Sequence, residues 1–126
     1  MLKIAHDVLY NHPLKENHRF PMIKYELIPE QLIMENTCVE NNFFKPGLIL
    51  DKNILLTHDK IYYDKLKNQQ LDKKEIRAIG FPMSEKLIER EKMIVQGTIE
   101  SALYSIEHGI STVSYTHLTL PTNHPV

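Results

Sequence analysis

The sequence predicts an α/β protein in which a mostly parallel sheet is flanked by helices. Three observations support this class. A short β-rich run opens the chain at residues 2–10, a long amphipathic helix is expected over residues 84–108, and a second β-like run follows at residues 110–113. A strand, a helix and a strand in this order are typical of layered α/β architectures.

Length and composition exclude several classes of protein. The 126 residues suffice for about one domain. Fifteen Lys and Arg against 16 Asp and Glu, with no basic block, argue against direct nucleic-acid binding. No apolar run is long enough to span a membrane, and a charge comes too early for a signal peptide. The single cysteine, Cys38, excludes an internal disulfide framework. We therefore expect a soluble, cytoplasmic chain.

The N-terminal third is expected to hold a strand, a loop and a broken helix. The run Leu2–Tyr10 has the composition of a partly buried strand. Residues 11–21 are polar and rich in His, Asn and Pro, which is typical of a loop. Apolar residues then recur at helical spacing, but Pro29 interrupts the pattern, so two short helical pieces with a kink near Ile28 are expected. Residues 37–46 are expected to be irregular.

The middle of the chain is expected to hold a second strand and two short helices. The run Ile54–Thr57 is typical of a strand that ends at His58. Asp59 then has the position of an N-cap for the next helix. Residues 72–79 predict a further short helix that Gly80 closes.

The strongest helical pattern covers residues 84–108. Ser84 has the position of its N-cap, and Gly109 directly follows its last residue. The charged residues 89–92 are expected on its outer face. Its apolar stripe consists of Leu87, Ile88, Ile94, Val95, Ile99, Ala102, Leu103 and Ile106.

Residue spacing alone reveals no catalytic set. The seven histidines never stand at the spacing of zinc ligands, and the four glycines never cluster as in a phosphate-binding loop. Cys38 is expected to be a structural thiol. The unusual segment is the polar loop 11–21, because loops after strands line binding crevices in α/β proteins. An ordinary solvated loop is the equally weighted alternative.

Three blocks of sequence resemble the histone-deacetylase family, in its class IV and bacterial branch. Residues 12–25, HPLKENHRFPMIKY, resemble the first loop of that family. Residues 55–59, LLTHD, followed by a tyrosine, weakly resemble its second conserved segment. A third block comprises residues 79–82, IGFP, together with Arg90, Gly97-Thr98 and Ala102. The resemblance covers about residues 2–113.

The resemblance implies a fold and an activity. The family has the arginase-like α/β fold, with its active site in loops at the carboxyl ends of the strands. Its members use zinc-activated water to hydrolyse acyl-lysine or a related small amide. By resemblance, the pocket wall is formed by His18, Arg19, Phe20 and Pro21, and the rim by Phe81 and Pro82. Lys15 and Asn17 stand where the branch usually has Pro and Gly, and the turn at Gly80 lacks the aspartate of some relatives.

The chain departs from the family after about residue 112. The family's Gly-Gly-X-His-His segment and its zinc ligands have no counterpart here, so we expect no catalytic residue and no bound zinc in this chain. Residues 113–126, VSYTHLTLPTNHPV, resemble a translated sequencing adapter and are expected to form a non-native, disordered tail. The sequence thus predicts a truncated, inactive N-terminal part of a deacetylase domain at residues 1–112. Because most strands of the parent would then be missing, the apolar stripe of the helix at residues 84–108 is expected to lack part of its partner surface and to expose apolar area. A small non-enzymatic binding module that uses the 11–21 loop is the alternative.

Overall fold

A computed structural model of the chain describes residues 1–12, 14 and 21–115, and it has the expected α/β class. The elements are β1 (Lys3–Ala5), the 3-10 helix η1 (Val8–Tyr10), α1 (Lys24–Met34), the 3-10 helix η2 (Glu40–Asn42), β2 (Phe43–Phe44), α2 (Asp51–Ile54), α3 (Lys60–Lys67), α4 (Lys73–Ile79), α5 (Glu85–His108) and β3 (Ser111–Val113).

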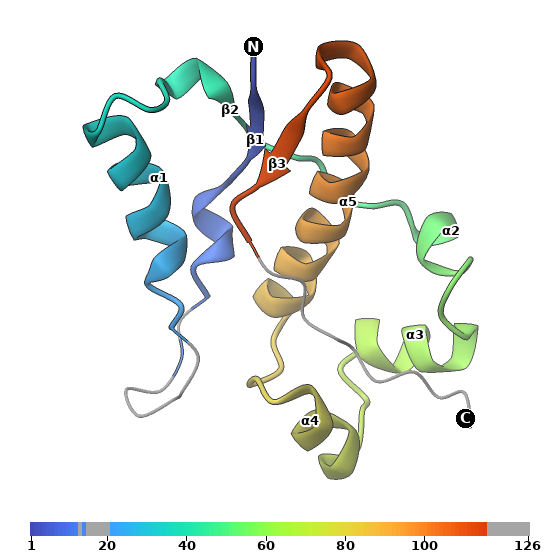
Figure 1. The fold of residues 1–126 in the computed structure, drawn as a ribbon. Coiled ribbons are helices and arrows are strands. Elements are labelled where there is room, and N and C mark those ends of the chain that lie inside the picture. The colour runs from blue at the N-terminus through green and yellow to red at the C-terminus, as the bar shows by residue number, and fades with distance from the viewer. Residues whose placement is uncertain (13, 15–20, 116–126) are drawn as a thin grey trace.

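The three strands form a small parallel sheet with β1 at its centre, in the order β2-β1-β3. Ile4 lies opposite Phe43 on one side and opposite Thr112 on the other. Helix α5 packs against β1 and β3, and the sheet lies between α5 and α1 (Figure 1). The parallel sheet is therefore confirmed.

The predicted helix boundaries in the second half of the chain are confirmed by their caps. The carboxylate of Asp59 accepts hydrogen bonds from the first turn of α3. Asp72 and Glu75 form a reciprocal capping box at the start of α4. The Oγ of Ser84 accepts a hydrogen bond from the amide of Leu87 at 3.1 Å. Gly80 ends α4 with a φ of 86°, a conformation that favours glycine.

The first strand is shorter than predicted. It ends at Ala5, and residues 8–10 turn into η1 instead of continuing the strand. The reason is local, because the carboxylate of Asp7 accepts a hydrogen bond from the amide of Leu9 at 3.0 Å and caps this turn.

The prediction of a second strand at residues 54–57 is wrong. Ile54 ends helix α2, and the following residues form a turn that leads to α3. The strand lies earlier, at Phe43–Phe44, where an irregular segment was expected. A short apolar run has no period of its own, so tertiary pairing with β1 decides which segment becomes the strand.

Helix α1 is continuous from Lys24 to Met34, so the expected division near Ile28 is also wrong. Pro29 lies inside this helix and is buried. Burial of the proline ring offsets part of the cost of the hydrogen bond that the ring removes.

The apolar stripe of α5 is buried at its N-terminal end and exposed further along. Leu87 and Ile94 are 2% and 0% exposed, whereas Leu103 and Ile106 are 61% and 83% exposed. The stripe thus exposes apolar area along the C-terminal half of α5, in agreement with the prediction of an incompletely covered helix.

The expected boundary of the tail lies inside β3, which ends at Val113. The next two residues, Ser114 and Tyr115, are buried. The Oη of Tyr115 donates a hydrogen bond to the carbonyl oxygen of Ile94 at 2.6 Å. The rest of the segment, residues 116–126, lies outside the described residues. Within the described part of the chain, no helix has the length and apolar character needed to cross a membrane.

Candidate functional site

Polar side chains follow β1 and β3 at the same edge of the sheet. His6 comes directly after β1, and its Nδ1 lies 2.9 Å from the Oγ of Ser114, which follows β3. Ser114 also donates a hydrogen bond to the carbonyl oxygen of Ala5 at 3.0 Å. Burial lowers the pKa of His6, and the nearby carboxylate of Asp7 partly opposes this effect. In open α/β sheets, this carboxyl edge is where ligands bind.

The polar loop expected to form the pocket wall begins just beyond this edge. Three of the expected wall residues, His18, Arg19 and Phe20, lie outside the described residues. Pro21 is exposed and precedes α1. Of the two expected rim residues, Phe81 is 6% exposed and belongs to the core, while Pro82 is exposed.

Arg90 on α5 connects the two chain segments that flank this loop. Its side chain is 1% exposed. Its Nε donates a hydrogen bond to the carbonyl oxygen of Tyr10, before the loop, at 2.8 Å. After the loop, its Nη2 lies 3.9 Å from the Sδ of Met22, and its guanidinium lies 5.2 Å from the ring centroid of Tyr25. One buried cation therefore holds both ends of the loop against α5.

The charge of Arg90 is balanced by its neighbour in the sequence. Its Nη1 donates a hydrogen bond to a carboxylate oxygen of Glu91. Burial raises the pKa of Glu91 to about 7, although the guanidinium acts in the opposite direction. His12, at the start of the loop, is 8% exposed, and burial and then the charges of Arg90 and Lys86 lower its pKa. Both effects disfavour a second cation at the base of the loop.

Arg90 and Glu91 do not lie on the outer face of the helix, where the run of charged residues 89–92 predicts them, so that prediction is wrong for these two residues. Both are buried, whereas Glu89 is exposed. The signal was present in the spacing. Arg90 and Glu91 follow Leu87 by three and four positions, so all three lie on the face that carries the core.

Among the described residues, no three His, Cys, Asp or Glu side chains lie close enough together to hold a metal ion. At the sheet edge, the described side chains can therefore position the segments that lead into and out of the loop. Cys38 is buried, and its thiol is free.

Comparison with known proteins identifies a relative that is longer than this chain. The chain is 32% identical over 114 residues, or 89% of its length, to an uncharacterized protein of Picosynechococcus sp.. It spans 38% of the length of that relative. No protein-family model matches the chain. The relative therefore supplies a longer homologous chain in which this part can be tested.

Proposed function

We propose that residues 1–112 are the N-terminal part of a zinc-dependent deacetylase that hydrolyses acyl-lysine or a small amide. In this proposal the sheet β2-β1-β3 is the first part of an arginase-like domain. The observation that carries the proposal is the contact of Arg90, a residue of the third resembling block, with Met22, which belongs to the block 12–25, and with the carbonyl oxygen of Tyr10 just before that block. Two separate blocks of the resemblance thus meet in space.

In this proposal, residues 1–112 contribute one wall of the substrate pocket. His18, Arg19, Phe20 and Pro21 form this wall, and Phe81 and Pro82 contribute the rim. A loop that borders a pocket must hold its position to within a fraction of an ångström for turnover to be efficient. The contacts of Arg90 with Tyr10 and Met22 supply such a constraint at both ends of the loop.

Zinc and the catalytic residues are assigned to the portion of the parent protein that this chain lacks. A catalytic zinc needs three protein ligands. The described residues bring no such set together. This chain alone is therefore expected to bind no stoichiometric zinc and to hydrolyse no acyl-lysine substrate.

A chimera tests the proposal. Residues 1–112 replace the matching segment of the Picosynechococcus protein, and the relative, the chimera and this chain are assayed against an acetyl-lysine peptide and an N-acetylated polyamine. The relative and the chimera are expected to show hydrolysis that a chelator abolishes and zinc restores, while this chain shows none. Absence of hydrolysis in the relative would overturn the proposal and favour a binding module.

A pair of substitutions in the chimera tests the wall itself. A guanidinium offers five donors in a rigid fork, which suits it to main-chain carbonyls or to a carboxylate product. Arg19→Ala is expected to lower kcat about tenfold or more, equivalent to ~1.4 kcal/mol of barrier. Glu16→Ala is the control and is expected to do little, because the proposal assigns its carboxylate no role in the pocket wall. Equal, small effects would assign Arg19 to the surface.

A further inference from the structure

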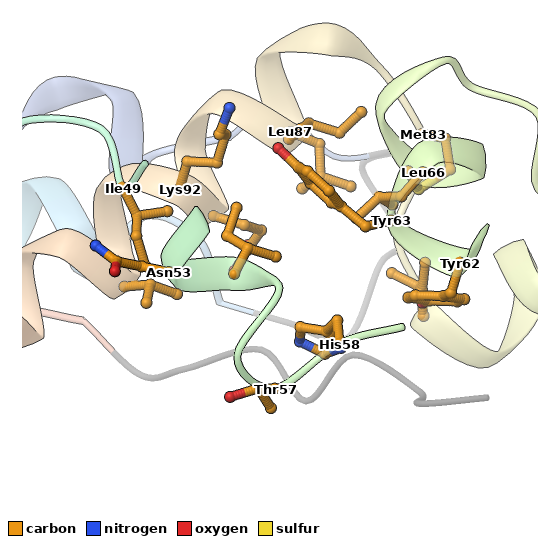
Figure 2. Close-up of a pocket in the computed structure, with 15 residues that line it drawn as sticks. Ile49, Asn53, Thr57, His58, Tyr62, Tyr63, Leu66, Met83, Leu87 and Lys92 are labelled. Atoms are coloured by element: carbon orange, nitrogen blue, oxygen red, sulfur yellow. The ribbon is translucent and has the colours of Figure 1, made fainter. Parts of the chain in front are cut away.

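A cavity of about 450 Å³ lies between the helices α2, α3 and α5 (Figure 2). Apolar side chains from four helices and their connections form most of its wall. These include Ile49, Ile54, Leu66, Ile79, Leu87 and Val95. Ligand pockets in proteins have volumes of roughly 300–1,000 Å³ and mostly apolar walls. An engineered apolar cavity of about 150 Å³ already binds benzene. The cavity therefore has room for a substituted aromatic ring.

The charged side chains in the wall are already paired. Glu91 accepts a hydrogen bond from Arg90, and the Nζ of Lys92 lies 3.4 Å from a carboxylate oxygen of Asp51. The hydroxyl of Tyr63 donates to the same carboxylate at 2.6 Å. A charged guest would lose its hydration without gaining an unpaired counter-ion from these residues, so the wall favours a neutral guest.

Two polar atoms in the wall have no hydrogen-bond partner within the described part of the chain. They are the Nδ1 of His58 and the Oη of Tyr62, and both are buried. The two rings are stacked, with centroids 6.0 Å apart. Figure 2 shows His58 on the segment between Asn53 and Tyr62. A buried polar group without a partner costs about 1–3 kcal/mol, and a ligand that supplies the partner recovers part of that cost.

We propose that this cavity is a binding site for a small neutral amphiphile, an aromatic or alkyl-aromatic molecule with one hydroxyl group. The apolar part lies against the side chains of α3 and α5, and the hydroxyl group completes the hydrogen bonding of His58 and Tyr62. The hydroxyl of Tyr62 and an imidazole nitrogen can each donate or accept, so one guest hydroxyl satisfies either tautomer.

The proposal is tested with 4-propylphenol and propylbenzene, which differ by the hydroxyl group alone. Each probe is titrated into the 15N-labelled chain, and amide shifts are followed by NMR. The phenol is expected to bind about two- to tenfold more tightly than propylbenzene, the range of one net hydrogen bond. Its shifts are expected to cluster on α2, α3 and the first half of α5. Tyr62→Phe is expected to remove most of the phenol's advantage and to leave propylbenzene unchanged.

A matched pair of tryptophan variants tests the location. Val95 lines the cavity and is 37% exposed, so Val95→Trp can fill the mouth without entering the core. Leu103 is an exposed apolar residue two turns further along α5, outside the lining set, and Leu103→Trp is the control. Binding is expected to be lost in the first variant and retained in the second. Equal affinity for the two probes in the parent chain, no binding of either, or unchanged binding in Val95→Trp would each overturn the proposal.

Discussion

Replacement of Arg90 by methionine removes the buried cation that holds both ends of the first loop. Methionine keeps the unbranched apolar part of the arginine side chain to about the position of Nε, so only the space of the outer guanidinium atoms is left empty. The change deletes the hydrogen bond from Nε to the carbonyl oxygen of Tyr10 and the ion pair with Glu91. It leaves a carboxylate buried without its counter-ion.

The magnitude follows from this uncompensated charge. Removal of one partner of a buried ion pair costs about 3–5 kcal/mol. For a domain of this size, each kcal/mol lowers Tm by roughly 3–6 °C. Arg90→Met is therefore expected to lower Tm by more than about 10 °C at pH 8, where Glu91 of the parent chain is ionised and the variant must either keep that buried charge unpaired or take up a proton. The double variant Arg90→Met/Glu91→Gln is expected to recover a large part of the loss, because no buried charge remains.

The assay is urea unfolding at pH 8, followed by circular dichroism, with thermal melts as a second measurement. Arg77→Met is the control, because Arg77 is exposed on α4 and its replacement should change stability by less than about 0.5 kcal/mol. A loss below about 1 kcal/mol for Arg90→Met would refute the assignment of Arg90 as the anchor of the loop. A double variant no more stable than the single one would refute the role of the buried carboxylate.

Three further predictions concern α5. Since burial raises the pKa of Glu91 from 4.5 to about 7, this group favours the folded state at low pH and loses that effect as pH rises. The unfolding free energy of Glu91→Gln should therefore rise relative to the parent by up to about 3 kcal/mol between pH 4.5 and 7.5, and a constant difference would contradict this. Gly97→Ala should destabilise the fold by about 1–2 kcal/mol, despite the better helix propensity of alanine. The new Cβ would lie 2.8 Å from the Oη of Tyr115 and 3.1 Å from the Cγ of Pro46. Glu89→Ala, at an exposed position of the same helix, is the control and should be near neutral in the same urea titration. The double variant Leu103→Glu/Ile106→Glu should reduce self-association, measured by light scattering, and leave the urea midpoint unchanged, because both side chains are exposed. An unchanged scattering signal would show that this face does not drive association.

The sequence alone determined the features that depend on neighbouring residues. The helix starts at Asp59, Asp72 and Ser84, and the end at Gly80, were predictable because a cap forms between groups within four positions. The long amphipathic helix was predictable because its apolar period repeats over many residues. The α/β class followed from the order of these elements. Local sequence also identified the loop at residues 11–21, which resembles the first loop of the deacetylase family. The function of that loop stays a prediction.

Tertiary structure decided the features that depend on contacts between distant segments. Phe43–Phe44 became a strand, and residues 54–57 did not, because pairing with β1 outweighs the preference of a short apolar run. The spacing of Arg90 from Leu87 places it on the core face of α5, but its hydrogen-bond partner, the carbonyl oxygen of Tyr10, is 80 positions away in the chain and was decided by the fold. The cavity of about 450 Å³ likewise exists because α2, α3 and α5 meet without filling the space between them. Side-chain packing sets such a volume, and no residue pattern along the chain records it.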